Sequence, residues 1–351
     1  MNASSKSAGC NTPDGLCDPW SALDSSGVGF VARMDGRPSH SIVEKALRVL
    51  ANLAHPGVMD HGGPAAEGSG LLMQIPDDFM RRECAGIGVF LPEYGYYAMG
   101  MVFMPRDPAL SSECERVFSD VGEAEGFRVL GWRTVPVNTD CIEERSRSSM
   151  PFFRQVFLAP LFDDTERIER VLYVFRRTLE KKVASWTGNN YRDFSIASLS
   201  SRTVVYKGLV RGNNLAAFYP DLADREFMSA FAIVHLRHII SGSPAWRQIQ
   251  PYRLIAHSGE FNTLGGNITR MRLHEPHLDS PHLGSDLEKV LPVLADGENG
   301  SMCFDRVLEL LLHGGRALPH AVMMLIPEAW GDKFSMGDDR RAFYEYHSAI
   351  M

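Results

Sequence analysis

Short runs with the alternation or β-branched content of strands fill much of this chain, and amphipathic runs lie between and after them. The strand-like runs cover residues 27–34, 68–75, 96–103, 127–135, 152–158 and 196–207. Apolar residues recur at helical spacing in residues 41–54, 111–125, 285–294, 304–312 and 318–325. Because runs of strands alternate with runs of helices, the pattern predicts an α+β domain in which helices cover layered sheets.

Five further segments have weaker patterns. Residues 86–91, 169–175 and 252–258 are predicted as strands, residues 77–83 as a short helix, and residues 226–232 as a helix. No internal repeat or linker marks a second domain.

Composition excludes several classes of function. The 351 residues carry a formal charge of -7 with no basic block, which argues against nucleic acid and anionic membrane surfaces as partners. Apolar runs such as residues 321–327 are far shorter than the ~20 residues that span a bilayer. Residues 1–25 are rich in Ser, Gly, Asn and Asp and lack the apolar stretch of a secretory signal, so we expect a flexible leader and a cytoplasmic protein.

Six ordered blocks resemble the N-terminal glutamine amidotransferase domain of glutamate synthase. They are Asp24–Phe30 (Asp-Ser-Ser-Gly-Val-Gly-Phe), Ser198–Gly208, Phe218–Leu222, His257–Asn267, Leu318–Trp330 and Arg341–Ala349. That family belongs to the N-terminal-nucleophile hydrolases, so the resemblance implies a four-layer αββα sandwich. It also implies that residues 26–351 form one type-2 amidotransferase-like domain.

The resemblance assigns the catalytic positions to Ser26, Ser258 and Gly259. The family's first mature residue is a Cys nucleophile with its own α-amine as general base, and this position holds Ser26. Other N-terminal-nucleophile hydrolases use Ser in this role, which here requires cleavage between Ser25 and Ser26. The family's oxyanion pair is Asn-Gly, and here it is Ser258-Gly259. Loss of one oxyanion donor typically costs on the order of 100- to 1000-fold in rate.

The substrate-binding positions are also altered. The family's Arg for the glutamine carboxylate is Arg237, in a run that adds His238 and Ser241 as candidate contacts and replaces polar neighbours with Ile239 and Ile240. The family's Asp for the glutamine α-amine aligns with Gly300. Glu298 and Asp305 are the nearby carboxylates that could replace it. We therefore expect a small carboxylate or amide as ligand, less polar than free glutamine.

No metal or cofactor is predicted. His274, His277 and His282 with Glu275 and Asp279 have the residue types of zinc ligands, but they match a surface connection of the family. The family's larger chains continue into a flavin-binding barrel with an iron–sulfur cluster. This sequence stops at about the place where those parts begin, and its six cysteines form no C-x-x-C pair.

Two hypotheses remain open from the sequence. In the first, the chain is an amide hydrolase or amidotransferase with Ser26 as nucleophile and a retuned pocket. In the second, it is a non-catalytic module that binds a small ligand or a partner, such as a separate synthase-type or ammonia-accepting subunit. In both, hydrolysis of glutamine is expected to be lost or altered.

Overall fold

Two four-stranded antiparallel sheets form the centre of the molecule. The computed structural model describes residues 25–54, 59–60, 63–64, 66–187, 194–239, 245–329 and 335–350. In the first sheet the order is β1 (Ser25–Ala32), β10 (Phe231–Ile239), β4 (Ala66–Gln74) and β9 (Thr203–Gly208). In the second it is β6 (Phe127–Thr134), β7 (Phe152–Pro160), β5 (Ala98–Met104) and β8 (Ser195–Ser200). Two short strands, β2 (Met59–Asp60) and β3 (Gly63–Pro64), pair separately.

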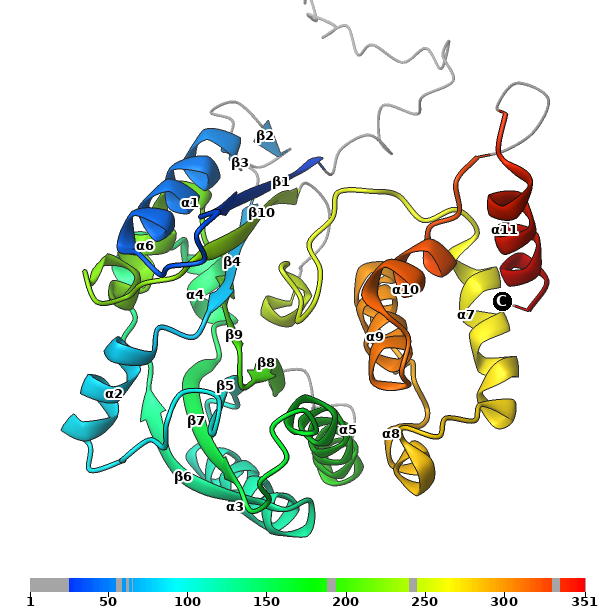
Figure 1. Cartoon of the computed structure of the whole chain (residues 1–351). Coiled ribbons are helices and arrows are strands. Elements are labelled where there is room, and N and C mark those ends of the chain that lie inside the picture. Colours follow the sequence, from blue (N-terminus) through cyan, green and yellow to red (C-terminus); the bar gives the residue numbers. More distant parts are fainter. Residues whose placement is uncertain are drawn as a thin grey trace, which may run out of the picture.

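Helices flank both sheets (Figure 1). On the first sheet lies α1 (His40–Leu53). The helix is close to β1, as shown by the 2.4 Å that would separate a Cβ at Gly29 from Val49. On the second lie α3 (Pro108–Ala124) and α5 (Ile168–Thr187). The smaller helices are α2 (Asp77–Gly86), α4 (Glu144–Ser148) and α6 (Leu215–Phe218). The predicted α+β class is confirmed, since two antiparallel sheets flanked by helices form the N-terminal-nucleophile hydrolase type of fold.

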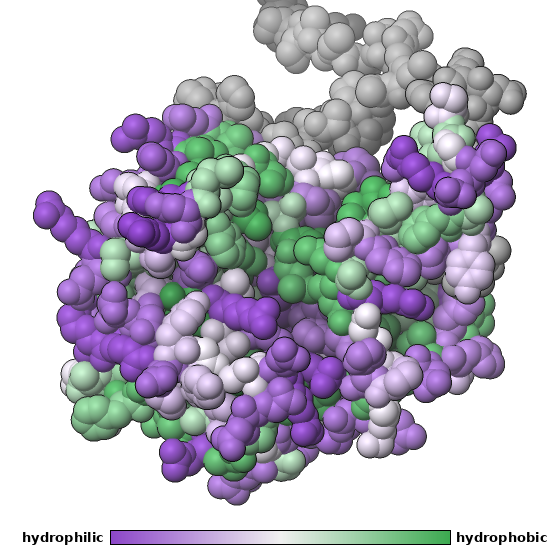
Figure 2. Space-filling view, viewed as in Figure 1, coloured by the Kyte–Doolittle hydropathy of each residue, from purple (hydrophilic) through white to green (hydrophobic). Residues whose placement is uncertain are grey.

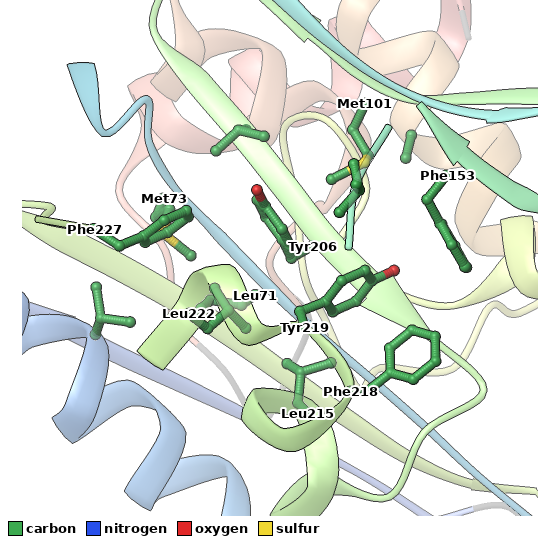
Figure 3. Packing of buried hydrophobic residues seen from close by; sticks show 14 of the residues in the cluster. Leu71, Met73, Met101, Phe153, Tyr206, Leu215, Phe218, Tyr219, Leu222 and Phe227 are labelled. Carbon is green, nitrogen blue, oxygen red and sulfur yellow. The ribbon is translucent and has the colours of Figure 1, made fainter. Parts of the chain in front are cut away.

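The main core lies where the two sheets meet. Tyr206 of β9 is at its centre, with ring centroids 5.1 Å from Tyr219 and 5.4 Å from Phe227. Figure 3 shows Met101 and Phe153 of the second sheet near these rings. A buried ion pair lies in the same region. Arg133 of β6 donates to both carboxylate oxygens of Asp221, at 2.8 and 2.9 Å. The Tyr206 hydroxyl donates to Asp221 at 2.9 Å, which ties the two sheets together.

The remaining helices form a group on the other side of the molecule from α1 (Figure 1). They are α7 (Leu264–His274), α8 (Leu287–Val290), α9 (Gly300–His313), α10 (Leu318–Leu325) and α11 (Asp338–Ile350). Tyr173 and Val174 of α5 share a core with this group. Within the described residues, no helix has both the length and the apolar composition needed to cross a membrane.

Four sequence-based assignments are wrong. The predicted strand at residues 169–175 lies inside α5, and the predicted helix at residues 226–232 is a turn followed by the start of β10. Residues 252–258 and 86–91 contain no strand. Residues 169–175 misled because residues 171–175 are an uninterrupted apolar and aromatic run, buried on two sides, against the second sheet and against the C-terminal helices.

Candidate active site

Ser26 and Arg237 lie side by side on one face of the first sheet. They are directly opposed residues of the antiparallel pair β1 and β10, and Gly68 of β4 is the next residue in the same row. Directly opposed residues of an antiparallel pair point to the same face. A Cβ at Gly68 would lie 2.3 Å from Cδ1 of Ile249, so the absence of a side chain there lets a connecting segment cross over the row. Ser26 is exposed and Arg237 is half-buried.

A second row lies two residues further along the strands, on the same face. It contains Val28, His235, Gly70 and Lys207. The missing side chain of Gly70 again makes room, because a Cβ there would lie 2.5 Å from the Gln250 carbonyl oxygen. The segment 249–252 therefore covers both rows.

The predicted oxyanion residues come directly after His257 in the chain. Hydrogen bonds hold the backbone of His257 over this second row. Gln250 pairs with both backbone groups of His257: its Oε1 accepts from the amide at 2.9 Å and its Nε2 donates to the carbonyl at 3.1 Å. Nε2 of His235 lies 3.2 Å from the same carbonyl oxygen. Ser258 and Gly259 come next in the chain and are exposed. The structure therefore brings the 258–259 backbone to the face that carries Ser26 and Arg237.

His235 acts here as a neutral hydrogen-bond donor. Burial lowers the pKa of its imidazole to about 4, even though the hydrogen bond to His257 opposes this shift. A neutral imidazole that donates from Nε2 matches the acceptor in front of it. Sequence reasoning gave this residue no role, although its position two residues before Arg237 on a strand places both on one face.

Hydrogen bonds of Tyr252 connect the start of α9, where Gly300 lies, to the segment that covers the sheet. The Tyr252 hydroxyl lies 2.8 Å from the Gln248 carbonyl oxygen and 3.2 Å from Oδ1 of Asn299, the N-cap of α9. Gly300, the first residue of that helix, is buried, and it borders a cavity together with Phe261 and Leu264. A Cβ there would lie 2.9 Å from Cδ2 of Phe261 and 3.2 Å from both methyls of Leu264.

Asp305 and Glu298, the two carboxylates near Gly300 in the sequence, are both engaged by arginines. Asp305 is fully buried and lies 2.7 Å from Arg253, and it accepts a hydrogen bond from the Leu254 amide at 3.1 Å. Glu298 accepts from Nε of Arg306 at 2.7 Å. Both carboxylates are held by arginines, so they stabilise the fold around α9 rather than a free ammonium.

One predicted contact residue does not lie on this face. His238 lies on the opposite face of β10, where its Nδ1 is 3.5 Å from Glu67. Its alternation with Arg237 along the strand explains this position, and the structure does not support its predicted contact with the ligand of Arg237. Ser241 and the predicted leader, apart from Ser25 at the start of β1, lie outside the described residues.

Lys207 is a further titratable group on this face that the sequence did not single out. Burial lowers the pKa of its ammonium to about 7, with the nearby Arg253 acting in the same direction. The Nζ atom donates to the carbonyl oxygens of Arg247 and Pro251, each at 3.3 Å, and lies 4.8 Å from the Tyr252 ring. It holds the covering segment against the sheet.

The histidine cluster near residue 277 does not form a metal centre in the described part of the chain. No group of three or more His, Cys, Asp or Glu residues there has an arrangement that could hold a metal ion. His274, His277 and His282 instead line a cavity between helices.

Two antiparallel sheets flanked by helices are the fold of an amidotransferase domain of the N-terminal-nucleophile type. The chain belongs to the class-II glutamine amidotransferases, whose family model matches residues 26–351. It is similar to the large chain of glutamate synthase [NADPH] from Bacillus subtilis, with 43% identity over 340 residues, which are 96% of this chain and 22% of that protein. The corresponding chain from Azospirillum brasilense is 35% identical, covering 95% of this chain and 22% of its own length.

Ferredoxin-dependent glutamate synthase from Spinacia oleracea chloroplasts is also 35% identical, over 93% of this chain and 20% of that protein. The chain thus spans about a fifth of the length of the curated relatives that it matches. The predicted family is confirmed, whereas the replacement of the family's Cys by Ser26 stays a prediction.

Proposed function

We propose that this glutamate-synthase-like amidotransferase domain has lost hydrolysis of free glutamine and binds a carboxylate ligand through Arg237. The observation that carries the proposal is the packing at Gly300. The resemblance places the family's amine-binding carboxylate at this residue, and a Cβ here would already lie 2.9 Å from Phe261 and 3.2 Å from Leu264. A glutamine ammonium there would lose water without gaining a counter-charge, which is costly.

Arg237 supports the binding half of the proposal. It lies in the same row as Ser26, and the Tyr252 hydroxyl and His235 are close enough for its charge to affect both of their pKa values. A guanidinium presents two parallel donors to a carboxylate. The ligand that fits has a carboxylate, a mainly apolar body and no α-amine.

The test uses glutamine and glutaramate, which is glutamine without its α-amine, in calorimetric titrations of wild type and Arg237→Ala. We expect glutaramate to bind more tightly than glutamine, and Arg237→Ala to weaken glutaramate by roughly 2 to 4 kcal/mol. Tighter binding of glutamine, or an unchanged affinity in Arg237→Ala, would refute the proposal.

A second candidate function is amide hydrolysis by Ser26. Its support is that Ser26 is exposed next to Arg237, near the Ser258–Gly259 backbone. The mechanism needs the free α-amine of Ser26 as general base, so residues 1–25 must be removed. The mass of the purified protein decides this point: a chain that begins at Ser26 supports the enzyme, and an intact chain contradicts it.

We further propose a synthase-type partner chain, because the relatives carry this domain within much longer proteins. We also propose a cytoplasmic location, as expected from the composition of residues 1–25. Copurification with tagged protein from the native host tests the partner. Recovery of the chain alone at all salt concentrations would contradict it.

A further inference from the structure

A cavity lies in the C-terminal helical group, and no described residue of the sheet that carries Ser26 and Arg237 lines it. Its volume is about 770 Å³, within the usual range of small-molecule sites. Most of its lining is apolar, from α7, α9 and α10, and includes Ile268, Met271, Val307, Leu311 and Met324. Figure 2 shows hydrophobic residues in the middle of the visible face, bordered by hydrophilic ones, between the sheets and these helices.

One buried polar atom of this cavity has no partner. His347 of α11 lines the cavity and is only 6% exposed, and its Nδ1 makes no hydrogen bond within the described part of the chain. Its Nε2 lies 3.3 Å from Nε2 of His320 on α10. An unsatisfied buried polar atom is costly, so an atom of this kind in a cavity wall indicates where a ligand's polar group belongs.

Positive charge lies at the same end of the cavity. Arg316 lines it and is close enough to His347 that its charge, together with burial and His320, lowers the pKa of the His347 imidazole. Arg316 is exposed, and no ion pair joins it to the described residues. The described lining contains two guanidinium groups, Arg270 and Arg316, against one carboxylate, Asp279.

We propose that this cavity binds an aliphatic carboxylate of medium chain length, with the carboxylate beside His347 and Arg316 and the apolar body along α7 and α9. His347 is neutral in this arrangement. His320 donates from its Nε2–H to Nε2 of His347, and the Nδ1–H of His347 then donates to the carboxylate. Arg316 supplies the counter-charge that the neutral imidazole lacks.

Three other lining residues are close to the candidate active site. They are Phe261, Gly300 and Phe304, and the rings of Phe261 and Phe304 lie 5.2 and 5.9 Å from the ring of His257. A ligand body there would contact the same aromatic rings that support the 257–259 backbone.

The test is calorimetric titration of the full chain with octanoate, and with octan-1-ol as the neutral ligand of matched length. We expect saturable binding of octanoate that persists in Arg237→Ala, and at least about tenfold weaker binding of the alcohol. Arg316→Gln, at an exposed position, and His347→Phe, which removes Nδ1 but keeps a ring, should each weaken octanoate roughly tenfold. Arg272→Gln is the matched control, because Arg272 is on α7 but outside the lining and pairs with Asp296.

Circular dichroism of each variant shows whether it is folded. If His347→Phe is unfolded, the affinity of Arg316→Gln for octanoate decides the test. The proposal is overturned if octanoate shows no saturable binding, if octanol binds equally well, or if Arg316→Gln binds like wild type. Loss of binding in Arg237→Ala would also overturn it, by assigning octanoate to the sheet face. A dimer that Arg316→Gln dissociates and that excludes octanoate would assign the cavity to a second copy of the chain. Because binding here is independent of Arg237 and Ser26, failure of the proposed function leaves this test unaffected.

Discussion

Substituting Ala for Gly300 measures directly how full the space beside α9 is. The added Cβ would lie 2.9 Å from Phe261 and 3.2 Å from Leu264, closer than ordinary van der Waals contact. Overpacking of this kind costs about 1 to 3 kcal/mol. Replacing a helical Gly by Ala returns at most about 1 kcal/mol. We therefore expect Gly300→Ala to lower the free energy of unfolding by roughly 1 to 2 kcal/mol.

Urea denaturation provides the measurement, and Gly86→Ala provides the matched control. Gly86 ends α2, and a Cβ there would meet nothing within 4 Å, so its substitution should be neutral or slightly stabilising. In a Phe261→Ala background the Gly300→Ala step should lose most of its cost, giving a coupling of about 1 kcal/mol. If Gly300→Ala is as stable as Gly86→Ala in the otherwise unaltered protein, the space is open. A carboxylate would then fit, and the reason given for the loss of glutamine binding would be wrong.

Three other predictions concern the nucleophile, a buried histidine and the core. In protein that begins at residue 26, Ser26→Cys should release no more ammonia from glutamine than Ser26→Ala, and a substantial recovery would show that the site has been wrongly aligned. The folded pKa of His235 is about 4 against an ordinary 6.5, so as pH falls between these values the unfolded chain takes up the proton first and stability is lost. Urea titrations at pH 7 and pH 4 should show that His235→Gln loses roughly 2 to 3 kcal/mol less stability between these pH values than wild type does. Equal losses in the variant and in wild type would contradict the lowered pKa of His235. Asp221→Ala removes the most buried partner of Arg133 and leaves it with Glu83, so it should cost about 2 to 4 kcal/mol in urea unfolding. Asp120→Ala, at a 52% exposed side chain, should cost under about 1 kcal/mol; similar costs would show that burial is not decisive.

The sequence predicts those elements of the fold whose residues face one buried side. The strand β1 and the helix α1 were predicted to within two residues of their ends, because their apolar residues recur with a single period. The prediction failed for α5, which is covered on two sides, and for residues 226–232, where an apparent helical spacing runs from a turn into β10. Contacts with distant parts of the chain determine the secondary structure of these segments, and the local residue pattern does not reveal those contacts.

Some positions in the site can likewise be explained from the sequence and others cannot. Alternation along β10 explains why Arg237 faces Ser26 and why His238 does not. The roles of Gln250 and Tyr252 follow from hydrogen bonds between residues that are not neighbours in the sequence, such as the two between Gln250 and His257. Similarly, the filling of the space at Gly300 depends on Phe261, which is 39 residues away in the sequence.

Ammonia release from glutamine by protein that begins at Ser26 tests the central claim most directly. A freed Ser26 amine supplies the general base, so this form gives the nucleophile its best conditions. We predict ammonia production no greater than that of the Ser26→Ala variant. Turnover of about 1 per second or faster that Ser26→Ala abolishes, within the ordinary range for enzymes, would contradict the account.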